Sequence, residues 1–264
     1  MASRLAPLAP VEATLTAMRL RYGDPVTHGL STTLPPGITA AAGWSSAARL
    51  VDGSQLPSLL DAAVRRWDAP PHVAAALAWK CYSYWVTLPA VLGYATAHRV
   101  PLLVPRDVLV RFHGHQPFLS VALRPGIKVA VLPSDPLVHT NRPDVRVVAD
   151  EAALLAAFRR TALDRHLDPI LEGIRSTVHV GRRNLLGSVA SGISYGIARS
   201  AHVLPGSPIT VAKELLDAFG IADLVDLSED ETGRVYVCRR TCCLAFTLPE
   251  PKICSGCPVP QLAV

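Results

Sequence analysis

The sequence predicts an α+β fold: a mostly helical body with a small antiparallel sheet, followed by a short C-terminal segment rich in cysteine. Half of the 264 residues are hydrophobic and 18% are charged, which supplies enough apolar side chains for a substantial core. Patterns typical of helices precede and follow a group of short β-branched runs, an order that favours α+β over an alternating parallel sheet. Five of the six cysteines lie between residues 238 and 257, so the end of the chain is expected to carry chemistry of its own.

The first hundred residues are expected to be mainly helical. Residues 11–22 predict a short helix, and residues 23–53, which are rich in Gly, Pro, Ser and Thr, predict an ordered loop. Residues 56–67 predict a second helix that ends before Pro70 and Pro71. From there to about His98 we expect one long helix or two abutting helices, bent at Pro89.

A long apolar stretch over residues 73–97 raises the question of a membrane span. A spanning helix needs about 20 predominantly apolar residues. This stretch carries Lys80, and a lysine at the middle of a membrane costs about 2.5–3.5 kcal/mol. Pro89 interrupts it further. We therefore predict a buried helix and no membrane span.

The middle of the chain predicts strands, and the part after it predicts helices. Residues 107–112, 117–123 and 127–132 are short β-branched or alternating runs between Gly and Pro, and they predict a small antiparallel meander. Residues 133–147 predict a loop. Asp150 has the residue type of an N-cap for a helix over residues 151–167. Further helices are predicted near 168–177, 182–200 and 208–219, and a last strand over 235–239.

Charge and motif content exclude several classes of protein. The net charge of +5 is spread along the chain without long basic runs, so nucleic acid is not expected as a partner. No G-x-S-x-G elbow, P-loop or dinucleotide fingerprint is present. The first residues lack the apolar stretch of a secretory signal. We expect a cytoplasmic protein, either free or peripheral at the inner face of the membrane, where clustered cysteines more often serve metal binding or catalysis than disulfides.

The clustered cysteines have the spacing Cys-Cys-x10-Cys-x2-Cys, at Cys242, Cys243, Cys254 and Cys257. Four thiolates at this density can hold one tetrahedral metal ion or one [2Fe–2S] cluster. Structural zinc sites usually use two spaced pairs, and adjacent cysteines are awkward ligands for one ion, so the spacing favours [2Fe–2S] over zinc. A redox dithiol or disulfide stays open as a third interpretation. Gly256 can take the positive φ that such a tight turn often needs.

Other cysteines and histidines have less specific signals. Cys238 precedes Cys242 by four residues and could be a spare ligand, a partner in oxidation or a packed strand residue, of which packing is favoured. Cys81 lies among aromatic residues and is expected to be a core thiol. His113 and His115 have the spacing of two ligands on one strand face, but without a matching third ligand a loop pair is favoured over a metal site.

The stretch CRRTCCLAFTLPEPKICSGCP over residues 238–258 resembles the C-terminal motif of the FhuF-like ferric-siderophore reductase family, which is led by RR[ST]CCL and closed by CxxCP. RRNLLGSVASGISYGI over 182–197 is similar to a second family segment. DVLVRFHGHQPFLSVAL over 107–123 looks like a weaker segment shared with siderophore synthetases. Leu186 and Ser188 depart from the Trp and Asn that are common in the family.

This resemblance implies a one-electron reduction of an imported Fe(III)-siderophore that releases Fe(II). It implies a [2Fe–2S] cluster held by Cys242, Cys243, Cys254 and Cys257, with a ferredoxin or a flavoprotein reductase as the electron donor. The alternative is a zinc-stabilised protein that binds a siderophore or another partner without redox activity.

We expect two parts in the chain: residues 1–228 as a siderophore-reductase-like α+β body, and residues 229–264 as the [2Fe–2S]-binding segment. Arg239 and Arg240 adjoin the cysteine motif and are the candidate substrate-binding residues. Their charge could also raise the potential of the cluster. The simpler interpretation is two exposed arginines at the end of a strand.

Overall fold

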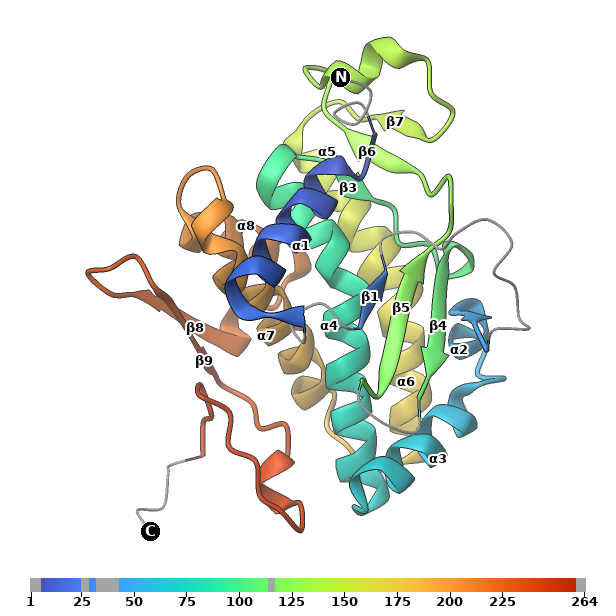
Figure 1. Ribbon diagram of the computed structural model, residues 1–264. Coiled ribbons are helices and arrows are strands. Elements are labelled where there is room, and N and C mark those ends of the chain that lie inside the picture. Colours follow the sequence, from blue (N-terminus) through green and yellow to red (C-terminus); the bar gives the residue numbers. More distant parts are fainter. Residues whose placement is uncertain (1–5, 25–28, 32–42, 114–116, 260–264) are drawn as a thin grey trace.

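The computed structural model describes residues 6–24, 29–31, 43–113 and 117–259, which form a mostly helical α+β fold with three small sheets (Figure 1). This confirms the predicted fold class. The helices are α1 (Ala9–Tyr22), α2 (Ala48–Val51), α3 (Leu56–Trp67), α4 (Pro71–Ala97), α5 (Glu151–Phe158), α6 (Asp168–Thr177), α7 (Arg182–Ser200) and α8 (Pro208–Phe219). The strands are β1 (Leu30–Ser31), β2 (Ser45–Ser46), β3 (Val100–Pro101), β4 (Val108–Phe112), β5 (Leu119–Leu123), β6 (Val129–Val131), β7 (Val145–Val147), β8 (Val225–Glu229) and β9 (Val235–Arg239).

Helix α4 lies at the centre of the molecule, as Figure 1 shows. It is continuous through Pro89, and most of its side chains are buried because α1, α3 and α7 pack around it. The prediction of a buried helix is therefore confirmed. Across the described ranges, no helix is both long and apolar enough to cross a membrane.

A single helical stretch runs from α5 to α6. Asp150 begins it as the predicted N-cap, since its carboxylate accepts a hydrogen bond from the backbone N–H of Ala153 at 2.8 Å. Between α5 and α6, residues Arg159–Leu167 wind as a π-helix. Such a segment is wider than an α-helix, and it points the fully buried His166 inward. The imidazole lies 2.6 Å from the Tyr82 hydroxyl and 2.8 Å from the Leu103 carbonyl oxygen.

The strands pair differently from the predicted meander. β4 and β5 form the expected antiparallel hairpin, but they belong to a four-stranded sheet with the order β1-β5-β4-β2, in which β1 is parallel to β5. β6 does not continue this sheet. It pairs antiparallel with β3 and parallel with β7 in a second sheet. The single meander was wrong because short β-branched runs indicate strands without specifying their partners.

Two predicted loops contain regular structure. The stretch 23–53 contains β1, β2 and α2, while its residues 25–28 and 32–42 lie outside the described residues. The stretch 133–147 contains a 3₁₀ turn, Pro136–Thr140, and β7. β8 was also missed. These elements are two to five residues long, too short for a periodic pattern to reveal them.

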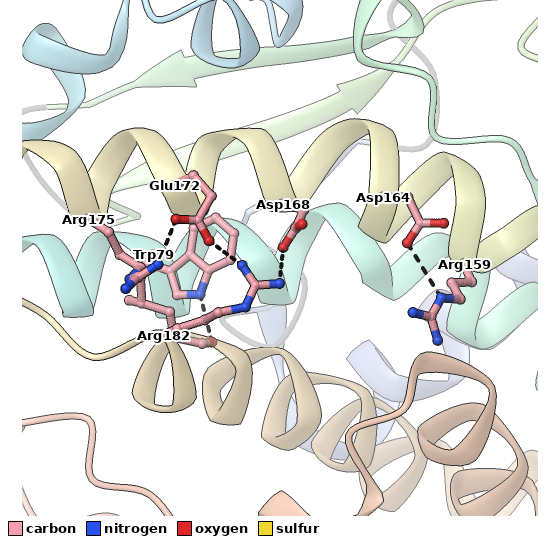
Figure 2. Close-up of polar contacts among 8 residues, drawn as sticks. Trp79, Arg159, Asp164, Asp168, Glu172, Arg175 and Arg182 are labelled. Carbon is pink, nitrogen blue, oxygen red and sulfur yellow. Dashed lines mark hydrogen bonds and ion pairs between the residues drawn. The ribbon is translucent and has the colours of Figure 1, made fainter.

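Ion pairs and a buried hydrogen bond hold the first turn of helix α7 in place. Figure 2 shows Arg182, its first residue, reaching Asp168 and Glu172 on α6. The indole N–H of Trp79 on α4 donates to the Leu185 carbonyl oxygen at 2.8 Å. Helix α7 in turn packs against the hairpin of β8 and β9. The expected boundary between residues 228 and 229 falls within β8, so this hairpin spans it.

Candidate metal centre

The C-terminal cysteine segment, residues 241–257, docks on the body through two glycines. A Cβ atom on Gly187 of α7 would lie 1.8 Å from the Thr241 hydroxyl oxygen, and one on Gly256 would lie 1.8 Å from the Val237 carbonyl oxygen of β9. The backbone N–H of Arg239 also donates to the Gly256 carbonyl oxygen at 2.9 Å. Because no side chain fits at either position, both glycines are required by close packing.

Gly256 therefore serves a purpose other than the predicted one. It does not have the positive φ expected for the turn between Cys254 and Cys257. The turn is closed instead by the Cys257 N–H, which donates to the Cys254 carbonyl oxygen at 3.1 Å. The glycine lets this turn lie directly on β9, which sets the position of both cysteines relative to the body.

The first cysteine pair lies on a sharp turn. Leu244 has φ of 63°, a left-handed conformation that costs on the order of 1–3 kcal/mol for a residue other than glycine. In this conformation the Leu244 N–H donates to Cys242 Sγ at 3.3 Å. The N–H of Lys252 donates to the Ala245 carbonyl oxygen at 3.0 Å, which ties the turn to the approach to Cys254.

The structure brings the two cysteine pairs together. Cys243 Sγ and Cys254 Sγ are 3.7 Å apart. With metal–sulfur bonds of about 2.3 Å, two ligands of one tetrahedral metal lie about 3.8 Å apart, so this pair has the separation that one metal requires. Burial raises the pKa of Cys242, the hydrogen bond from the Leu244 N–H opposes that effect, and the negative charges of Cys243 and Cys257 raise the pKa further.

Taken over the described ranges, no group of three or more His, Cys, Asp or Glu side chains is arranged to hold a metal ion. The close sulfurs form one pair. A two-iron cluster takes its four cysteines as two such pairs, one on each iron. One sulfur pair at this separation can lie on one metal ion, either a zinc ion or one iron of a two-iron cluster, so the donor set is compatible with both.

A lysine of the central helix faces this sulfur pair. Lys80 Nζ on α4 lies 3.2 Å from Cys254 Sγ and 3.7 Å from Cys243 Sγ. Its side chain is partly buried, and burial alone would lower its pKa. The negative charges of Cys243 and Cys254 outweigh that effect, so the net direction is upward. Lys80 is therefore a fixed positive charge in contact with the sulfurs.

The two sulfurs shift each other's pKa. The pKa of Cys243 is lowered, first because Cys254 donates a hydrogen bond to it, and then because of the positive charges of Lys80 and Arg239 and the N–H of Ala245. Donation of that hydrogen bond raises the pKa of Cys254. The pair therefore favours the thiolate at Cys243, and the thiolate is the form that binds metals.

A second cation is buried beside the cysteine segment. Arg239 is 3% exposed, and its Nη2 atom donates to the Ser188 hydroxyl oxygen at 3.2 Å. Its Nε and Nη1 atoms are buried and have no hydrogen-bond partner among the described residues. An unpaired buried guanidinium is costly. Its charge lowers the pKa of Cys243, so it lies close enough to act on the sulfurs.

The other candidate residues lie elsewhere. Arg240 is exposed and forms a two-bond ion pair with Asp226, at 2.8 and 2.6 Å.

Cys238 is exposed on β9, so the favoured interpretation of a packed strand residue is wrong. Cys81 packs against the core as predicted, and burial raises its pKa to about 11. His113 lies 2.9 Å from the Ser120 hydroxyl oxygen.

Of the predicted histidine pair, His115 lies outside the described residues. Of the two candidate arginines, the structure buries one beside the sulfurs and pairs the other at the surface, so they are not two equivalent exposed charges. The sequence did not reveal Lys80 as part of the site. An isolated lysine in an apolar helix indicates a buried partner, but nothing in the sequence identified a partner more than 160 positions away.

A scan against protein-family models finds no match for this chain, and a search of the curated proteins finds no similar one.

Proposed function

We propose that this protein is a ferric-siderophore reductase of the FhuF-like kind, in which a [2Fe–2S] cluster held by Cys242, Cys243, Cys254 and Cys257 passes one electron to a bound Fe(III) chelate. The observation that carries the proposal is the sulfur pair of Cys243 and Cys254, 3.7 Å apart, with one partly buried cation in contact and a second, buried cation nearby.

The negative charge of a [2Fe–2S] cluster is the reason why two nearby cations support the proposal. An oxidised [2Fe–2S] core with four thiolates carries two negative charges, and reduction adds a third. Lys80 and Arg239 supply two positive charges on the body side of the sulfurs. In the part of the chain that the structure describes, the buried Nε–H and Nη1–H of Arg239 find no acceptor, and a bound anionic group would offset their burial.

The chain's own residues would hold and insulate such a cluster. Lys80 donates to Cys254 Sγ, and the Leu244 N–H donates to Cys242 Sγ. Hydrogen bonds and nearby charge of this kind raise the potential of an iron–sulfur site above that of a bare one. Helix α4 lies against the sulfurs through Lys80, and β9 supports the turn between Cys254 and Cys257.

When bound, the cluster supplies one-electron transfer from a reduced donor to a ferric chelate. The electron comes from a ferredoxin or a flavoprotein reductase, Fe(III) becomes Fe(II), and no bond within the chelating ligand breaks. Hard oxygen donors of a siderophore hold Fe(II) less tightly than Fe(III), so reduction releases the metal. We place this reaction in the cytoplasm, where an imported chelate and such donors meet.

The test is anaerobic purification followed by metal analysis and spectroscopy. We expect a coloured protein with about two irons and two sulfides per chain and an EPR signal of spin one-half after dithionite reduction. Cys257→Ser should lose or strongly alter that signal, whereas the matched variant Cys238→Ser, outside the ligand set, should keep it. The reduced protein should then reduce ferric siderophores.

Two outcomes would overturn the proposal. A colourless protein with one zinc per chain would favour the zinc-stabilised binding protein. Unchanged iron and sulfide content in Cys257→Ser would remove the ligand assignment.

A further inference from the structure

A wide cleft lies between the hairpin of β8 and β9 and the ends of α1 and α7. Its volume is about 1100 Å³, near the upper end of small-molecule sites. Helices α1 and α7 each contribute their last turns, and the hairpin contributes its tip and β9. Figure 1 shows the hairpin projecting from the body next to these helices. The cleft is open to solvent, so a bulky solute can enter it.

The cleft is strongly basic. Arg21 of α1, Arg199 of α7 and Arg234 of the hairpin all line it, together with His202. None of the lining residues in the described part of the chain is acidic. Three guanidinium groups from three separate elements thus face one space, which favours an anionic occupant.

These arginines are held by aromatic rings and leave their charge available. The guanidinium of Arg21 lies 5.6 Å from the ring centre of Tyr22, and that of Arg234 lies 5.2 Å from Tyr236. Arg199 stacks on Tyr84 at 5.5 Å and donates to its hydroxyl. Within the described ranges, none of the three makes an ion pair.

Carboxylates lie at the hairpin next to this cleft. Glu229 Oε1 comes within 3.4 Å of the position that a Cβ atom on the lining residue Gly233 would take. Asp230 accepts hydrogen bonds from the Tyr236 hydroxyl, the Thr232 hydroxyl and the backbone N–H of Arg234. These donors do not include the guanidinium of Arg234, but the negative charge of Asp230 remains and offsets part of that positive charge.

The cleft reaches the cysteine segment. Ser255, the residue after Cys254, lines one side, and Cys238 of β9 lines it as well. A solute in the cleft would therefore lie next to the turn that carries Cys254 and Cys257. The space is a place from which an iron chelate could receive an electron.

From this juxtaposition we infer that the cleft binds the substrate, and that the substrate is an anionic ferric chelate with carboxylate groups, of the α-hydroxycarboxylate class. The inference rests on the proposed function. Carboxylates match the planar fork of arginine, which can bind them through two parallel hydrogen bonds. The chelate core of a ferric tris-hydroxamate is neutral, because its three ligand charges cancel the metal charge, and it would gain nothing from three arginines.

Gallium(III) citrate tests the cleft without any electron transfer, because gallium(III) is not reduced under these conditions. Calorimetry on the cluster-loaded protein should show binding that weakens with added salt. Arg21→Gln and Arg234→Gln should each weaken it about fivefold. Arg146→Gln, on an exposed arginine of β7 outside the cleft, should leave it unchanged. The gallium complex of desferrioxamine B, a cationic hydroxamate, should bind more weakly.

Unchanged binding in both cleft variants, or tighter binding of the hydroxamate complex, would overturn the inference. If the variants instead slow reduction only by a protein donor, the cleft receives the donor and the inference also fails. Failure of the proposed function has a different signature: gallium citrate binds and depends on the arginines, yet the protein holds no cluster and reduces no chelate.

Discussion

The Nζ atom of Lys80 lies 3.2 Å from the Sγ atom of Cys254. This contact joins the middle of the central helix to the cysteine segment, which is otherwise held by β9 and α7. It places a positive charge against one sulfur of the closest pair. This positive charge stabilises any negative charge added to the sulfurs, as happens when a redox centre takes up an electron. Substitution of Lys80 therefore tests the redox role.

Replacing Lys80 by methionine removes the charge and keeps most of the side-chain volume. We expect the reduction potential of the cluster to fall by on the order of 100 mV, because a unit charge at this range acts through a partly desolvated medium. Spectroelectrochemical titration measures it. Lys80→Arg, which retains the charge, should lie closer to the wild type. Equal potentials in wild type and Lys80→Met would show that the lysine does not act on a redox centre.

Arg239 should act in the same direction as Lys80, but from a position without a sulfur contact. Arg239→Met is expected to lower the potential, and the double variant with Lys80→Met should approach the sum of the two shifts, since both act mainly through charge. The exposed, ion-paired Arg240 provides the control, because Arg240→Gln should change the potential little. An effect of Arg240→Gln as large as that of Arg239→Met would argue against a special position for the buried cation.

The helices could largely be predicted from the sequence, whereas the site could be predicted only in part. The helix over residues 56–67 was predicted with its observed bounds, because its apolar positions recur at helical spacing and Pro70 and Pro71 follow. The cysteine spacing located the centre. Arg239 was a candidate from the sequence, but nothing there separated it from Arg240, which the structure leaves exposed while it buries Arg239 at the end of β9. Lys80 could not be predicted, because it is far away in the sequence.

Gly256 should be intolerant of any side chain. A Cβ atom there would meet the Val237 carbonyl oxygen at 1.8 Å, so Gly256→Ala must push the Cys254–Cys257 turn away from β9. We expect a loss of cluster content and about 3 kcal/mol of stability. Iron analysis and chemical unfolding measure both. Gly181→Ala is the matched control, because its Cβ would come no closer than 4.0 Å to its nearest neighbour. Full iron content in Gly256→Ala would show that the turn does not depend on this contact.

The buried His166 predicts how stability depends on pH. Burial lowers its pKa from 6.5 to about 4, so the unfolded chain binds a proton in a range where the folded chain does not. Stability is therefore fully present above the unfolded pKa and decreases as the pH falls toward 4. Between about pH 8 and about pH 5.5 this residue alone should remove about 1.4 kcal/mol from the free energy of unfolding.

Urea unfolding of the wild type and of His166→Gln over this range tests the prediction. The variant will be less stable at neutral pH, because it disturbs the hydrogen bonds with Tyr82 and Leu103. The informative quantity is the slope, since carboxylates titrate alike in both proteins. The difference between the two proteins should shrink as the pH is lowered. A constant difference would show that the pKa of His166 is the same in the folded and the unfolded protein.

Thiol labelling should separate the two cysteines outside the ligand set. Cys238 is exposed on β9, whereas Cys81 packs against the core and its pKa is raised to about 11 by burial. A thiolate is the reactive form, so Cys81 should react slowly even where a reagent reaches it. In the cluster-loaded protein, brief treatment with a maleimide should add one label, at Cys238, with little change in iron content. Mass spectrometry locates the label, and Cys238→Ser should abolish it. Labelling at Cys254 or Cys257 of the loaded protein, with Cys238 protected, would mean that Cys238 takes the place of a ligand.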